Sequence, residues 1–152
     1  MNIRIPTFKD YDRIMDLLID MANTTDIFAY HNPTYRDKYI RNMITEFCCN
    51  GCFYIAEDKG EIHGLIAGMI QSQIWLPHVN LLVETAFFIT PEYRHTSMGA
   101  RLFKAYKDQG KKLLDKGVID NFCITQNSNF SNFDYGKHGF DKLETIYVWS
   151  ND

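Results

Sequence analysis

Residues 81–103 are the part of this sequence that most restricts the fold. An apolar run over residues 81–89 has the composition of a strand, Pro91 marks a loop after it, and an amphipathic helix pattern begins at Met98. The loop carries Arg94 and three further potential donors at positions 95–97. Free backbone N–H groups at a helix start attract phosphate, and the helix dipole adds to that attraction. The segment therefore predicts a cradle for a pyrophosphate, although an ordinary connection between a strand and a helix has the same pattern.

Length and composition indicate one soluble globular domain over residues 1–152. This length permits a sizeable core, and 45% of the residues are hydrophobic while 23% are charged. The net charge of −3 argues against general electrostatic capture of nucleic acid or membranes and leaves room only for a local basic site. No apolar run reaches membrane-spanning length, and charges come too early for a signal peptide. We therefore expect a cytoplasmic protein.

The cysteines are Cys48, Cys49, Cys52 and Cys123. Cys49 and Cys52 have CxxC spacing, but no second ligand pair follows at a spacing typical of zinc sites. We expect no metal, and reduced cysteines that lie in or beside the core, with a metal or redox role as the alternative.

Apolar periodicity predicts the order of helices and strands. Residues 53–57 and 61–74 have the pattern of a hairpin around a turn at residues 58–60, and Gly64 and Gly68 in its second arm suggest a bulge or a close approach by another group. Helices are expected after a capping pattern at residues 7–10, from Pro33, from Met98 to the stop at Gly117, and over residues 128–137; the other strands are expected at residues 3–5, 81–89, 118–125 and 140–149. The fold class is therefore α/β (α+β), a mixed sheet with helices on it, in the order β-α-α-β-β-β-α-β-α-β.

Two segments carry a resemblance to a known family. Arg94-His95-Thr96-Ser97-Met98-Gly99 matches a coenzyme A loop written Q/R-x-x-G-x-G/A, and Tyr135-Gly136-Lys137-His138-Gly139-Phe140 matches a late Y-x-K-x-G-F segment. With these motifs in this element order, the chain resembles the GNAT superfamily of acyl-CoA-dependent N-acyltransferases. The resemblance implies a mostly antiparallel central sheet flanked by helices. Residues 91–97 and 138–147 are also similar to phage-encoded members, which implies a location in the host cytoplasm.

Two positions depart from the family pattern. Ser97 stands where the family has a glycine, which permits a positive φ or a close backbone approach to an anion. If the local φ is negative, the Ser97 hydroxyl can donate to a phosphate oxygen instead. Ser128, flanked by Asn127 and Asn129, stands where the family often has asparagine, so a contact to pantetheine or substrate is shifted or lost.

The resemblance implies transfer of an acetyl group from acetyl-CoA to an amine, without a metal. Family members stabilise the thioester carbonyl with a main-chain N–H on the strand before the loop, here around Phe88 and Ile89, and Tyr135 matches the tyrosine that protonates the leaving thiolate. The cofactor-binding residues implied in this way are Phe88, Ile89, Arg94, His95, Thr96, Ser97, Met98, Gly99, Ala100 and Asn127.

Glu84 is the candidate general base. It lies in the apolar run before the loop, and burial there would raise its pKa, which suits a base that deprotonates an amine. The alternative is a position at a rim, paired with a lysine. His31, His78, His95 and His138 are weaker candidates, for which a solvated or packed role is the simpler interpretation.

These observations predict a single-domain N-acetyltransferase in which the amine attacks acetyl-CoA directly in a ternary complex. An acylated Cys123 is kept as a variant of this mechanism. A catalytically weak or inactive module that binds coenzyme A or a protein partner is the alternative, with Ser97 as its hint. The acceptor can be a small amine, an antibiotic, a protein lysine or N-terminus, or a modified nucleotide, and a homodimer is left open.

Overall fold

The structure is a computed structural model that describes residues 1–25, 33–126 and 133–144. Its α-helices and strands are β1 (Asn2–Arg4), α1 (Tyr11–Thr25), α2 (Pro33–Asn50), β2 (Gly51–Asp58), β3 (Glu61–Ser72), β4 (Asn80–Ile89), α3 (Met98–Asp115) and β5 (Asn121–Cys123). Three short 3-10 helices accompany them: η1 (Phe8–Asp10), η2 (Pro91–Tyr93) and η3 (Tyr135–His138). Among the described residues, no helix is both long and apolar enough to cross a membrane.

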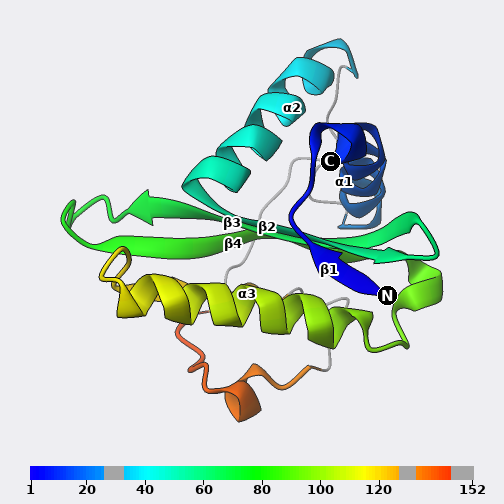
Figure 1. Ribbon diagram of the computed structural model, residues 1–152. Helices are drawn as coiled ribbons and strands as arrows, with labels where there is room; N and C mark the ends of the chain where they lie inside the picture. Colours follow the sequence, from blue (N-terminus) through cyan, green and yellow to red (C-terminus); the bar gives the residue numbers. More distant parts are fainter. Residues whose placement is uncertain (26–32, 127–132, 145–152) are drawn as a thin grey trace, which may run out of the picture.

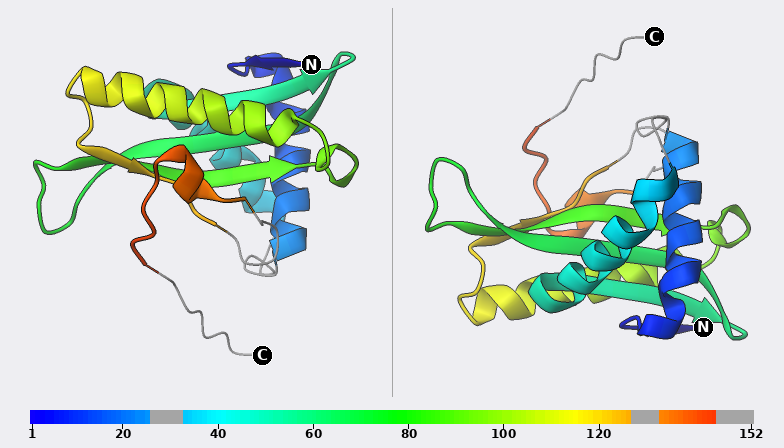
Figure 2. Two further views of the ribbon diagram at one scale, coloured as in Figure 1. Left: turned by 90° about the horizontal axis from the view of Figure 1, so that it is seen from below. Right: turned by 90° about the horizontal axis from the view of Figure 1, so that it is seen from above.

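One sheet organises the fold, with helices on both faces. The strand order is β1-β2-β3-β4-β5; the first four strands are antiparallel, and β5 runs parallel to β4. Helices α1 and α2 cover one face and α3 covers the other (Figures 1 and 2). Ile14, Leu17 and Ile44 anchor the core under α1 and α2, while Leu102 and Tyr106 anchor the core under α3. The predicted mixed, mostly antiparallel sheet and its element order are confirmed as far as β5.

The predicted hairpin turn between β2 and β3 is confirmed. Lys59 and Gly60 both have positive φ angles, 52° and 86°. Two such residues between paired strands match the twist of a two-residue hairpin, which fixes the pairing of Asp58 with Glu61.

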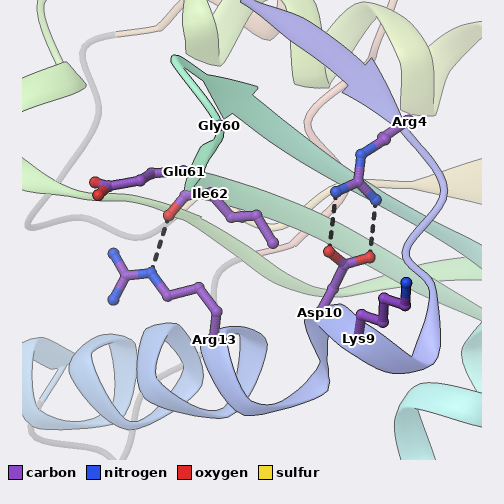
Figure 3. Close-up of a pocket in the computed structure, with 7 residues that line it drawn as sticks. All are labelled: Arg4, Lys9, Asp10, Arg13, Gly60, Glu61 and Ile62. Atoms are coloured by element: carbon purple, nitrogen blue, oxygen red, sulfur yellow. Dashed lines mark hydrogen bonds and ion pairs between the residues drawn. The ribbon is translucent and has the colours of Figure 1, made fainter.

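An ion pair joins β1 to the start of α1. The guanidinium of Arg4 donates to both carboxylate oxygens of Asp10, at 2.8 and 2.9 Å, and holds the pKa of that carboxyl well below its usual range (Figure 3). Asp10 also accepts the backbone N–H of Thr7 at 2.6 Å, as the capping pattern predicts. Beside the pair lies a cavity of about 510 Å³, lined by Arg4, Lys9, Asp10, Arg13, Gly60, Glu61 and Ile62.

The chain after β5 differs from the expectation. Of the expected helix at residues 128–137, the described part contains only the start of η3, and residues 140–144 of the expected closing strand are not extended into the sheet. Gly139 ends η3 with a φ of 87°, and the Phe140 ring packs against Phe103 and Phe122, with centroids 5.8 and 5.3 Å away. This aromatic packing takes Phe140 away from strand pairing. The rest of both segments lies outside the described residues.

Helix α3 lies very close to β3, as Gly64 and Gly68 suggested. A Cβ atom built on Gly64 would lie 3.1 Å from the Leu102 side chain, and one on Gly68 would lie 2.8 Å from the ring of Tyr106. Both partners are fully buried. The two glycines therefore set the distance between the helix and the sheet.

We predict that Gly68→Ala lowers the free energy of unfolding by about 1–3 kcal/mol, because the buried Tyr106 ring must shift to admit the methyl group. Denaturant unfolding measures the change. Gln71→Ala, at an exposed position of the same strand, is the control and should change stability by less than about 0.5 kcal/mol. A Gly68→Ala protein as stable as the wild type would show that α3 does not pack this closely.

Candidate functional site

The site is built where β4 and β5 part. The two strands pair only from Leu81 opposite Asn121 to Val83 opposite Cys123. On its other side, β4 pairs Glu84 with Gly68 and Ala86 with Ala67, so Thr85 is an extra residue in a β-bulge. A bulge bends its strand, and beyond it the second edge of β4 has no partner strand within the described part of the chain. Gly64 and Gly68 suggested a bulge or a close approach by another group, and both occur at Gly68, with the extra residue on β4.

The ladder decides which backbone groups face the open edge. Thr90 donates its N–H to the carbonyl of His63 on β3, at 2.8 Å. Since the direction of the N–H groups alternates along an antiparallel strand, the N–H of Phe88 also points to β3, whereas that of Ile89 points to the open edge. The Ile89 carbonyl on the same edge accepts the Nε–H of Arg94 at 3.1 Å.

Glu84 and Tyr106 each form a hydrogen bond to the backbone at the base of this opening. Oε2 of Glu84 accepts the backbone N–H of Thr125 at 3.0 Å, just past the end of β5. The Tyr106 hydroxyl on α3 donates to the carbonyl of Cys123 at 2.6 Å and also lies 3.3 Å from the carbonyl of Leu82. Side chains thus replace strand pairing at the point where the strands separate. Sequence reasoning missed Tyr106, although a buried tyrosine in a helix stripe needs a hydrogen-bond partner.

Glu84 is buried, which matches the first of the two positions considered for it rather than a place at a rim beside a lysine. The residue is only 7% exposed, and its partner is a backbone N–H rather than a lysine. Burial raises the pKa of Glu84 to about 7, and the hydrogen bond from Thr125 offsets part of this effect.

The loop after β4 leads into α3 with exposed side chains. His95, Thr96, Ser97 and Ala100 are exposed, whereas Met98 is fully buried and donates its backbone N–H to the hydroxyl of Thr96 at 3.2 Å. Ser97 is the N-cap of α3, and its φ of −73° is open to any residue. The glycine of the family pattern is therefore not needed for backbone conformation here. A Cβ atom on Gly99 would lie 3.0 Å from the Ile89 side chain, so this position favours a glycine.

Arg94 lies back along the end of β4. Besides its hydrogen bond to Ile89, its guanidinium lies 5.7 Å from the centre of the Phe88 ring. The cation is thus held where β4 ends and the loop begins. Asn127, the remaining expected cofactor residue, lies outside the described residues.

Tyr135 belongs to a different part of the molecule. It lies in η3, half-buried, and its ring packs on Phe103 of α3 and on Phe133, with centroids 5.5 and 5.0 Å away. Figure 2 shows η3 as the orange turn beside α3. The structure thus places Glu84 and Ile89 on β4, with the loop directly after it, whereas Tyr135 packs against α3 through Phe103.

The four cysteines are free thiols. Cys52 is buried, and burial raises its pKa to about 12. Burial also raises the pKa of the half-buried Cys123, whose strand lies beside the opening. Because the thiolate is the reactive form of cysteine, these surroundings oppose nucleophilic chemistry at both residues.

A small apolar cavity lies on the opposite face of β4. It has a volume of about 90 Å³ between α1, α2 and the sheet, and its lining residues are Leu18, Tyr39, Ile40, Met43, Ile44, Phe47, Phe53, Ala67 and Ala86. Ala86 follows the bulge directly, and Ala67 is its partner on β3. These two small side chains leave space beside the bulge.

A mixed sheet covered on both faces, with an open strand edge that leads to the N-terminus of α3, defines an α+β domain. The sequence profile of the acetyltransferase (GNAT) family matches residues 13–140. The chain therefore belongs to this family, as its two motifs predicted. No curated protein is similar enough in sequence to count as a match.

Solved structures share the fold at low sequence identity. A predicted acetyltransferase from Clostridium acetobutylicum, solved with acetyl-CoA, has a TM-score of 0.71 and 15% identity, with 98% of this chain and 95% of that chain covered. Glucosamine-6-phosphate N-acetyltransferase from Arabidopsis thaliana has a TM-score of 0.71 and 14% identity, with 99% and 98% covered. A transcriptional regulator from Bacillus halodurans C-125 has a TM-score of 0.68 and 15% identity, with 97% and 98% covered. These likenesses confirm the fold.

We predict that Glu84→Gln stabilises the protein at alkaline pH. Burial raises the pKa of Glu84 from 4.5 to about 7, so its contribution to stability is complete below about pH 4.5 and is lost as the pH rises through 7. Glutamine keeps an oxygen for the Thr125 N–H but does not ionise. The variant should gain up to about 3 kcal/mol over the wild type at pH 8.5, and little at pH 4.5.

Denaturant unfolding across this pH range measures the gain. Glu46→Gln, at an exposed position of α2, is the control and should follow the wild type. A stability difference between Glu84→Gln and the wild type that does not change with pH would contradict the raised pKa.

Proposed function

We propose that the protein is an N-acetyltransferase that uses acetyl-CoA as cosubstrate and transfers the acetyl group to an amine. The observation that carries the proposal is the open edge of β4, which runs from the bulge at Thr85 to the N-terminus of α3. Membership of the family and the shared fold of a neighbour solved with acetyl-CoA support it.

In this proposal the pyrophosphate of coenzyme A binds at the loop before α3. The exposed hydroxyl of Ser97 and the backbone N–H groups of Gly99 and Ala100 supply donors, and Arg94 supplies positive charge. Thr96 and Met98 shape the loop instead, because the Thr96 hydroxyl donates to the carbonyl of Tyr93 and accepts the N–H of Met98, while His95 lines the loop. The negative φ of Ser97 supports the hydroxyl contact, because a serine adopts this conformation without strain.

The thioester carbonyl then lies against the open edge of β4. Of the two residues named for this role, Ile89 has its N–H on that edge, so it is the better donor to the oxygen that gains charge during attack. Phe88 contributes through its ring and its place in the strand.

Glu84 serves as the general base and Tyr135 as the acid. A carboxyl group whose pKa is about 7 is partly ionised at neutral pH and can accept a proton from the ammonium group of the acceptor, directly or through water, so that the free amine attacks the thioester. Tyr135 then protonates the departing thiolate, a role that rests on its match to the family motif. The raised pKa of Cys123 supports direct attack in a ternary complex over an acylated cysteine.

The second candidate is a weak or inactive module that binds coenzyme A or a protein partner. It is favoured by the shared fold of a protein named as a transcriptional regulator. The negative φ of Ser97 removes the conformational need for glycine, so Ser97 supports this candidate only if its side chain keeps the phosphate away from the backbone. The likeness to phage-encoded members supports placing either candidate in a host cytoplasm. The acceptor class and a homodimeric state are left open by both.

We predict that acetyl-CoA at about 100 times its Kd stabilises the fold by about 2–3 kcal/mol. Ser97→Ala should weaken binding by roughly 1 kcal/mol because one hydrogen bond is lost, and Ser97→Gly should not restore it. Arg94→Ala should weaken binding while the protein stays folded. Thermal shift and calorimetry measure these changes, with Lys38→Ala on α2 as the control. If millimolar acetyl-CoA causes no thermal shift, both proposed functions that include binding of the cofactor are ruled out.

We predict that Tyr135→Phe lowers kcat by about 10- to 1,000-fold and leaves acetyl-CoA affinity nearly unchanged. Phenylalanine keeps the ring packing on Phe103 and removes only the proton donor. A thiol-release assay with an acceptor found by screening amines measures turnover, with the exposed Tyr39→Phe as control. Turnover at the wild-type rate, with chemistry rate-limiting, would mean that another group protonates the sulfur.

A further inference from the structure

His63 on β3 is a buried histidine next to the start of the loop at residues 94–99. It is 9% exposed, and its ring stacks on Tyr93 with centroids 4.1 Å apart and planes at 19°. Tyr93 is the last residue of η2 and immediately precedes Arg94. The carbonyl of His63 also accepts the N–H of Thr90. The ring and the backbone of His63 thus both hold η2, which lies between β4 and the loop, against β3.

Two carboxylates face the two nitrogens of this ring. Oε1 of Glu92 on η2 lies 3.7 Å from Nδ1, and Oε2 of Glu61 on β3 lies 3.8 Å from Nε2. Within the described part of the chain, the buried Nδ1 has no hydrogen-bond partner. The ring is therefore placed to form an ion pair on each side when it is protonated.

The remaining charged groups around the ring come from α1 and β2. Arg13 donates its Nε–H to the carbonyl of Ile62 at 3.0 Å (Figure 3). Hydrogen bonds to the Glu92 carboxyl keep its pKa below the usual range, and the charge of Arg13 adds to this effect. Asp58 accepts the hydroxyl of Tyr93 at 3.2 Å. Glu92 thus stays ionised, and the stacked tyrosine is fixed at its far end.

We propose that His63 is a positioning residue whose protonation tightens the attachment of η2 to β3, through Glu92 and the stacked Tyr93, and so orders the loop that binds coenzyme A. Histidine is the side chain that ordinarily changes charge between pH 5 and 8. Protonated His63 attracts both carboxylates, while neutral His63 keeps only the stack and the backbone bond. Loop order and cofactor affinity should therefore rise as the pH falls from 8 to 6. The link to affinity rests on the proposed function, whereas the link to loop order does not.

Hydrogen exchange of the amides of residues 93–98, without cofactor, tests the positioning. His63→Phe keeps a ring for the stack and removes the charge, and Glu92→Gln keeps the histidine and removes its partner. Comparing proteins at the same pH cancels the intrinsic pH dependence of exchange. At pH 6 the wild-type amides should exchange about three- to fivefold more slowly than those of either variant, and at pH 8 the three proteins should agree within about twofold. His78→Phe, at an exposed histidine of the β3–β4 loop, is the control and should match the wild type at both values.

Acetyl-CoA affinity, measured on the same proteins, supplies the second readout. The wild type should gain about three- to fivefold more affinity than His63→Phe between pH 8 and pH 6, and taking this difference removes the titration of the cofactor itself. Equal pH profiles of wild type and His63→Phe in exchange, or a protection difference of the same size at both pH values, would overturn the proposal. A pH-dependent exchange difference in a wild-type protein that binds no acetyl-CoA would confirm the positioning of the loop and overturn the proposed function alone.

Discussion

One extra residue in β4 is the constraint on which the rest of the site depends. Thr85 has no counterpart on β3, so the strand bends there and leaves β5 after three paired residues. The backbone polar groups that lose their partner must be satisfied in another way. Glu84 takes the N–H of Thr125, the Tyr106 hydroxyl takes the carbonyl of Cys123, and Arg94 takes that of Ile89. The residues nearest the proposed chemistry are therefore also those that repair the sheet where it opens.

The two uses of Glu84, its bond to the N–H of Thr125 and its part in the proposed chemistry, explain why a carboxyl group is kept in an apolar interior. Burial disfavours the ionised form of Glu84, and the fold pays for that with stability above neutral pH. A glutamine would hold β5 equally well through its oxygen and would avoid the cost. A carboxyl group that lowers stability where an uncharged side chain would serve as well fits the role proposed for Glu84 as a general base. The bulge thus creates both the opening and the unusual acid at its base.

Local patterns in the sequence were enough for the order of elements as far as β5, because apolar spacing, Pro33 and the turn at residues 58–60 act over short distances. They also suggested a bulge or a close approach around Gly64 and Gly68, without deciding between the two. The end of the chain was misjudged, because Phe140 has a strand composition but packs on rings far away in sequence. For the site, the sequence supplied Glu84 with two alternatives, and only three-dimensional burial decided between them.

Roles that depend on contacts between distant segments were beyond sequence reasoning. Tyr106 lies on the buried face of its helix, but nothing local in the sequence indicates that its hydroxyl reaches two separating strands. The same holds for His63, which is separated from its stacking partner Tyr93 by the whole of β4. Conversely, only the structure shows that the helix starts at Ser97 with an ordinary negative φ, so that no glycine is needed there for backbone conformation.

The helix that begins after Ser97 also fixes a distance within the site. Met98 at its first turn and Tyr106 at the strand opening are eight residues apart, or about 12 Å along a rigid axis. Any flexible molecule held by its charged end at the first turn, with its reacting end at the opening, must match that span. Inserting one residue between them would lengthen the span by about 1.5 Å and turn one end by about 100° relative to the other. The length of this segment of α3 is therefore under a geometric constraint that no single side chain reveals.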